Sequence, residues 1–138
     1  MNEDSSTRKF TDMSAAELKD SMARFEGVSV VATVNPDGTP DAAIFVPAMP
    51  DEEHVVLVLA NNHSRANIER TGRARLVYYR GNPQAEEKAA RHAGARLDLA
   101  LVRAEGETAA EYEQVAKAYP HMNPAVMILR IERILPVG

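Results

Sequence analysis

The segment with the strongest chemical character runs from Leu59 to Ile68 and reads LANNHSRANI. It passes from an apolar strand pattern into a short helix pattern, and Ser64 is placed to cap the start of that helix. The first N–H groups of a helix are unpaired and its dipole is positive there, so an anion is stabilised. His63, Ser64 and Arg65 add an imidazole, a hydroxyl and a guanidinium, so the segment predicts a phosphate-binding helix start. The alternative is an ordinary capped surface helix whose arginine faces solvent.

Other chemistry is excluded or not indicated. The chain has no cysteine, which rules out disulfides, thiolate metal sites and cysteine nucleophiles. No histidine pair has the spacing of a helical zinc motif, and no nucleophile elbow, dinucleotide-binding loop or P-loop occurs. The acidic run Asp51-Glu52-Glu53 is expected to be a solvated loop rather than a metal or acid–base site.

The composition predicts one folded domain. The chain has 138 residues, of which 45% are hydrophobic and 26% charged. A net charge of −4, seven phenylalanines and tyrosines and no tryptophan argue against nucleic-acid binding. No apolar run suits a membrane span and the first residues do not resemble a secretory signal, so no membrane partner and a cytoplasmic location are expected. Residues 1–12 are interpreted as a flexible tail and 13–138 as the domain.

The elements that must position the candidate segment follow from local signals. Ser14 and Glu17 form a capping box, which predicts a helix to about Phe25, ended by Gly27. A β-branched run and the turn around Asp37 and Gly38 predict an antiparallel hairpin of strands 28–34 and 41–47. The next elements are expected to be a strand at 54–60, a helix at 64–70 and a strand at 73–80.

The second half of the chain is less regular. Pro83 favours a helix reaching about His92, ended by Gly94. The alternation of apolar and polar residues predicts a strand at 95–104. Thr108 and Glu111 form a second capping box, which predicts a helix reaching about Tyr119. A last strand is expected at 125–135. About six strands and four short helices favour a mainly antiparallel barrel, since closure removes exposed edges, with a sandwich as the competing architecture.

The order of these motifs resembles that of a known superfamily. A helix leads into the run 30–34, the turn Asp37-Gly38-Thr-Pro40, a strand, the segment His63–Ile68 and the strand 74–79. This order is similar to that of the pyridoxamine 5′-phosphate oxidase-like, FMN-binding split-barrel proteins, in particular their small single-domain members. The resemblance implies a homodimeric, six-stranded antiparallel split β-barrel with short helices. It also implies FMN at the subunit interface and an oxidoreductase acting on a small redox substrate of unknown identity.

The resemblance carries cofactor-binding roles to particular residues. Its phosphate-binding segment falls on His63, Ser64 and Arg65, with Asn67 at the position of a family asparagine. One register matches Ser64-Arg65 to a family Ser-Arg pair. The preferred register, anchored on Asn67, matches His63-Ser64 to a Lys-Thr pair and makes Arg65 a helper.

The flavin ring is expected to lie along the strand after Pro40, beside Ile44, Phe45, Val46 and Pro47, whose backbone groups can meet its edge whatever their side chains. The alternative is that these residues are ordinary barrel core. The partner subunit is expected to contribute the segment His121-Met122-Asn123, in which His121 is a weak candidate for acid–base chemistry.

Departures from the family pattern limit the activity. Pyridoxamine 5′-phosphate oxidases have an arginine and a lysine on the ring strand, where this chain has Ala43 and Ala48, and they use a tryptophan that this chain lacks. That oxidase activity is therefore not expected. F420 or haem is the alternative cofactor, and a non-enzymatic dimeric ligand-binding protein with a degenerate flavin site is the alternative function.

Overall fold

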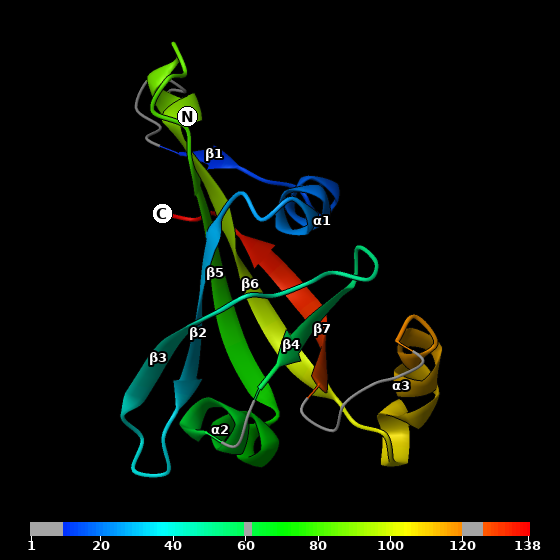
Figure 1. Ribbon diagram of the computed structural model, residues 1–138. Coiled ribbons are helices and arrows are strands. Elements are labelled where there is room, and N and C mark those ends of the chain that lie inside the picture. Colours follow the sequence, from blue (N-terminus) through cyan, green and yellow to red (C-terminus); the bar gives the residue numbers. More distant parts are fainter. Residues whose placement is uncertain (1–9, 60–61, 120–125) are drawn as a thin grey trace, which may run out of the picture.

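The protein is a curled antiparallel sheet with short helices at its ends and on one flank (Figure 1). The computed structural model describes residues 10–59, 62–119 and 126–138. Six strands lie in the order β3-β2-β5-β6-β7-β4. Their bounds are β2 Val28–Val34, β3 Pro40–Phe45, β4 His54–Val58, β5 Arg73–Gly81, β6 His92–Val102 and β7 Val126–Leu135. The three α-helices of the described residues are α1 Ala15–Ala23, α2 His63–Thr71 and α3 Ala109–Ala116.

The hairpin of β2 and β3 is confirmed. Val30 pairs with Ile44 and Val34 with Pro40 in an antiparallel ladder. The turn is closed by the Asn35 N–H, which donates to the Thr39 carbonyl at 2.9 Å, while Gly38 takes a φ of 87°. Asp37 accepts from the Thr39 N–H at 3.0 Å, as its type and place in the turn predict.

The sheet rolls until its two edges meet. Past the end of β3, Ala48 pairs with Val56 of β4 through two backbone hydrogen bonds of 3.0 and 2.7 Å. This bridge joins the first and last strands of the sheet order, so the six strands enclose an interior. The fold predicted from the sequence, a mainly β split barrel of six antiparallel strands, is confirmed.

Alternate residues of the strands face a single core. Its fully buried members include Val31, Leu57, Leu76, Leu97 and Leu129, together with Leu18 of α1 and Ile68 of α2. The intervening residues of β4 and β7 face outward, where Val56 and Ile128 pack against Val115 of α3. In contrast, the outer face of the β2–β3 hairpin carries exposed apolar side chains: Val28, Val34, Ile44 and Val46.

Three expected helix signals act differently in the folded chain. Helix α2 begins at His63 and is capped by Asn62, whose Oδ1 accepts from the Arg65 N–H at 2.9 Å, so Ser64 is not the cap. The expected helix at 83–92 is wrong apart from a short 3₁₀ turn at Lys88–Arg91. The ladder of β6 with β5 begins at His92 and includes Gly94, because strand pairing outweighs the local helix preference.

The second capping box is also wrong. The Thr108 hydroxyl exchanges hydrogen bonds with the backbone of Arg103, at 2.6 and 2.8 Å, and makes no cap bond to α3. At the other end of the chain, Thr11 and Asp12 form a two-residue strand, β1, beside Ala93 and Gly94, where the sequence suggested the end of a flexible tail.

The end of α1 depends on two unusual backbone positions. Phe25 follows the helix with a φ of 55°, the left-handed conformation that glycine normally occupies at this place. Gly27 was expected to end the helix, but its role in the folded chain is different. A Cβ added there would lie 2.4 Å from Cζ of Tyr78 and 2.6 Å from the Tyr79 carbonyl oxygen, so the Tyr78 ring packs directly on its backbone.

Substituting Gly27→Ala is therefore expected to lower the free energy of unfolding by about 2 kcal/mol, because the ring and the strand must move apart. Urea denaturation measures the loss. Gly81→Ala is the matched control, since its Cβ would meet only the flexible end of the Tyr79 side chain, at 3.2 Å. An equal effect of the two substitutions would contradict the packing argument.

Candidate functional site

The start of α2 borders an open pocket of about 490 Å³. His63 and Asn67 of the predicted phosphate segment line it, whereas Ser64 is buried and Arg65 is not among its lining residues. The opposite wall is the β2–β3 turn. The full lining is Asn35, Pro36, Asp37, His63, Ala66, Asn67 and Arg70.

The Asn67 side chain joins helix α2 to the β2–β3 hairpin through hydrogen bonds. It is 2% exposed, and its Nδ2 donates to the Thr33 hydroxyl at 3.0 Å and to Oδ1 of Asn35 at 2.9 Å. Its Oδ1 accepts from Nη1 of Arg70 at 3.0 Å. Both amide hydrogens are thus used within the chain. Asn67 holds the two walls of the pocket together and orients an arginine.

Arg70 is the pocket residue that the sequence reasoning missed. Its guanidinium also donates to the Val34 carbonyl, so it is anchored to both α2 and β2. A guanidinium carries five N–H donors, which leaves further donors for a ligand. The signal was present in the spacing, because positions 63, 67 and 70 share one face of a helix.

Arg65 lies on another face of α2. Its Nε donates to Glu69 Oε1 at 3.1 Å and its Nη1 to the Leu59 carbonyl at 3.1 Å. These bonds tie the helix to the end of the preceding strand segment. The sequence predicted Arg65 as a helper of phosphate binding, but Arg70 rather than Arg65 lines the pocket that His63 borders.

The segment predicted to lie beside the flavin ring, residues 44–47, borders a second pocket and is called the ring segment below. Ile44, Phe45, Val46 and Pro47 line a space of about 190 Å³ between β2, β3 and the end of α1. Ile44 and Val46 are exposed, while Phe45 packs against the core, so the segment is part core and part surface. Within the described part of the chain, β3 pairs with β2 alone, so its other edge offers free backbone groups.

The structure therefore does not bring all the predicted residues into one cavity of a single chain. The helix segment and the ring segment border different pockets. Ala43 stands in register with Val31 on the inward side of the sheet, and Ala48 forms the closing bridge. His121, Met122 and Asn123 lie outside the described residues.

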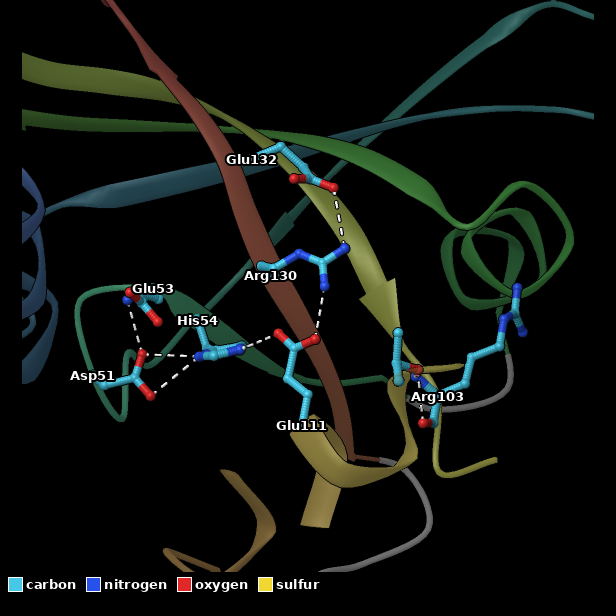
Figure 2. A network of polar contacts seen from close by, with 8 residues as sticks. Asp51, Glu53, His54, Arg103, Glu111, Arg130 and Glu132 are labelled. Atoms are coloured by element: carbon cyan, nitrogen blue, oxygen red, sulfur yellow. Dashed lines mark hydrogen bonds and ion pairs between the residues drawn. The ribbon is translucent and has the colours of Figure 1, made fainter. Parts of the chain in front are cut away.

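A chain of ionic contacts joins the loop before β4 to α3 and β7 (Figure 2). His54 is 6% exposed, and its Nδ1 lies 3.0 and 3.1 Å from the two carboxylate oxygens of Asp51. Its Nε2 lies 2.6 Å from Oε2 of Glu111. The other oxygen of Glu111 accepts from Nη1 of Arg130 at 2.7 Å, and Arg130 reaches Glu132 at 3.3 Å.

These contacts favour a charged imidazole. Burial lowers the pKa of His54, but the hydrogen bonds and charges of Glu111 and Asp51 outweigh it and hold the pKa above its usual value. Both ring nitrogens are occupied, so His54 acts as a cross-link. The acidic loop at 51–53 was expected to be solvated, yet Asp51 is half-buried in this network, and Glu111 serves His54 rather than a helix cap.

The described residues contain neither a metal site nor a membrane-spanning helix. No group of three His, Asp or Glu side chains is arranged to hold a metal ion in the part of the chain that the structure describes. Across the same residues, no helix combines the length and apolar character needed to cross a membrane.

Comparisons with solved structures agree on the fold. An FMN-binding protein from Syntrophomonas wolfei matches 90% of this chain and 86% of its own, with 17% identity and a TM-score of 0.59. A variant of HupZ from Group A Streptococcus matches 89% and 98% of the two chains, with 25% identity and a TM-score of 0.59. A candidate pyridoxamine 5′-phosphate oxidase from Lactobacillus delbrueckii matches 86% and 91%, with 16% identity and a TM-score of 0.54.

The chain has the split-barrel fold of the pyridoxamine 5′-phosphate oxidase-like proteins. An F420 reductase and HutZ, a haem storage protein from Vibrio cholerae, share this split barrel, each with a TM-score of 0.50. No family model and no curated protein matches the sequence.

The His54 network makes stability depend on pH. Because the folded-state pKa of His54 lies above the unfolded one, its contribution is complete below about pH 6.5 and disappears as the pH rises through the folded-state pKa. Urea denaturation between about pH 6 and pH 9 is expected to show wild type losing its advantage over His54→Gln as the pH increases. A constant difference between the two proteins across this range would contradict the charged cross-link.

Proposed function

We propose that this split barrel binds FMN, with the phosphate at the start of α2. The observation that carries the proposal is that His63, in the first turn of α2, and Arg70, in its last turn, border one pocket. The unpaired N–H groups at the His63 end of the helix favour an anion. The fold is shared with an FMN-binding protein, which supports the same cofactor here.

The residues present suit a phosphorylated ligand. A pocket of about 490 Å³ lies within the range of roughly 300–1,000 Å³ typical of small-molecule sites. Arg70 can form charge-assisted bonds to phosphate oxygens while Asn67 keeps it in place. Asp37, whose carboxylate is held by Thr39, lines the same pocket and can accept from ribityl hydroxyl groups.

The flavin ring of the bound FMN would meet the free edge of β3. Ile44 and Val46 offer apolar side chains, and the strand edge offers backbone hydrogen-bond groups. The flavin supplies the redox chemistry when bound, which makes the protein an oxidoreductase with a small-molecule substrate. Ala43 and Ala48 stand where pyridoxamine 5′-phosphate oxidases have basic residues, so that particular reaction is not proposed.

The phosphate assignment is tested by fluorescence titration with FMN and with riboflavin, which lacks the phosphate. In the double variant His63→Ala/Arg70→Ala, FMN affinity is expected to fall at least ~10-fold while riboflavin affinity stays unchanged, because charged hydrogen bonds to phosphate are lost. Arg96→Ala is the control, since Arg96 lies on β6 and donates to the Pro136 carbonyl.

Equal losses for FMN and riboflavin would refute the phosphate role of this pocket. Ser64→Ala/Arg65→Ala separates the two faces of α2. A larger FMN loss in that variant than in His63→Ala/Arg70→Ala would favour the register in which Ser64 and Arg65 bind the phosphate.

We also propose that a second copy of the chain covers the outer face of the β2–β3 hairpin. Four apolar side chains gather there, and Ile44 and Val46 are 69% and 70% exposed. Exposed apolar side chains that share one face of a sheet are typical of interaction sites. A dimer would also bring the ring segment of one chain near a second wall, which a small chain cannot easily supply alone.

Sedimentation velocity tests the dimer. Val34→Lys is expected to yield monomer, because the new charge would be buried in the interface. Val58→Lys is the matched control: Val58 is also an exposed strand valine, but it lies on β4, outside the hairpin, and this variant should stay dimeric. A wild-type monomer, or the same behaviour of both variants, would refute the proposed interface.

The same pocket also suits F420, which carries a phosphate as FMN does, and the F420 reductase with this fold supports that alternative. HutZ supports haem in the same way. Visible absorbance of protein mixed with each cofactor separates the three. A chain that binds none of them would favour a non-enzymatic dimeric ligand-binding protein.

A further inference from the structure

The small pocket at the end of α1 contains a hydroxyl with no partner. Ser29, which lines this space of about 190 Å³, is 2% exposed. Its Oγ is buried and makes no hydrogen bond, and it is the one such side-chain atom among the described residues. A buried hydroxyl without a partner is unfavourable, so this atom is available to a ligand.

Neighbouring hydroxyls on the same side of the barrel are paired. The Ser21 hydroxyl lies 2.6 Å from the Tyr78 hydroxyl, and the Thr33 hydroxyl accepts from Asn67 at 3.0 Å. Ser29 lies two residues before Val31 on β2, facing the same interior. The missing hydrogen bond of Ser29 is therefore specific to this pocket and is not a general feature of strand β2.

The rest of the pocket is apolar and partly aromatic. Phe45 and Tyr78 contribute rings, and Met22 contributes a thioether that packs well against aromatic groups. Phe25 lines the pocket while its side chain is 77% exposed, and its backbone has the unfavourable φ of 55°. A strained backbone that presents an exposed ring at a pocket points to a binding role for that ring.

We propose that this pocket binds a small aromatic molecule that carries one hydroxyl, a phenol. The volume of the pocket exceeds the ~150 Å³ of an apolar cavity that holds benzene. The Ser29 hydroxyl can form one hydrogen bond with the hydroxyl of the ligand. Binding requires no cofactor and is separate from the phosphate pocket. Because Ile44 and Val46 also line the pocket, a role for the phenol as redox substrate rests on the proposed flavin site.

The test is an NMR titration of cofactor-free full-length protein with phenol and with toluene. Saturable binding of phenol is expected. Ser29→Ala should lower phenol affinity about five-fold and leave toluene affinity unchanged, since only phenol loses a hydrogen bond. No saturable binding, or equal changes for both ligands, would overturn the proposal. The FMN titration is independent of this measurement, so either proposal can fail alone.

Phe25→Gly tests the ring without risk to the fold. Glycine adopts the left-handed conformation freely, so the melting temperature is expected to stay the same or rise. Affinity for phenol and for toluene should both fall several-fold. Unchanged affinity for both would overturn the role of this ring.

The melting temperature of Ser29→Ala provides a separate check. It should equal or exceed that of wild type, whereas Ser21→Ala should melt lower because it loses a formed hydrogen bond. A loss in Ser29→Ala as large as in Ser21→Ala would show that the hydroxyl is already satisfied and would refute the site. Phenol affinity that weakens as protein concentration rises would assign the pocket to a second copy instead.

Discussion

Six strands enclose an interior only if the first and last of them meet, and in this chain they meet through one residue pair. The two hydrogen bonds between Ala48 and Val56 close the sheet. Once it is closed, alternate residues of every strand point into one core. Helices α1 and α2 lie at opposite ends of the barrel (Figure 1), and their residues Leu18 and Ile68 belong to the same core. Every candidate site lies at the rim or on the outer face of this barrel, because the interior is filled with side chains.

In the closed barrel, most buried polar side chains join one element of the fold to another. Asn67 is tied to Thr33 and Asn35, so it fixes α2 against the hairpin and leaves His63 and Arg70 to face the pocket. His54 joins Asp51 to Glu111, which anchors α3 on the opposite flank. In both cases a buried polar side chain is fully paired, as the cost of burying it requires. Among the residues that the structure describes, Ser29 is the exception, and its unpaired hydroxyl marks a pocket.

Much of the local structure could be predicted because its signals are local. The capping box of Ser14 and Glu17, the run 28–34 and the Asp37 turn all form as expected. Predictions failed where partners outside the expected helix compete for the same residues. Thr108 bonds to the backbone of Arg103, Glu111 to His54, and the residues around Gly94 pair with β5, although each sits in a helix-like local pattern.

The sequence by itself determined the strand alternation, the hairpin and the cationic, polar character of the α2 start, since these depend on neighbouring residues. Helical spacing puts positions 63, 67 and 70 on one face of α2, but only the tertiary structure decided that this face borders the pocket. Arg70 rather than Arg65 lies there because Asn67 and the Val34 carbonyl hold its guanidinium. The tertiary structure also left the Ser29 hydroxyl unpaired beside the Phe25 ring. Contacts between segments far apart in the chain depend on how the barrel closes, and local sequence patterns do not encode that geometry.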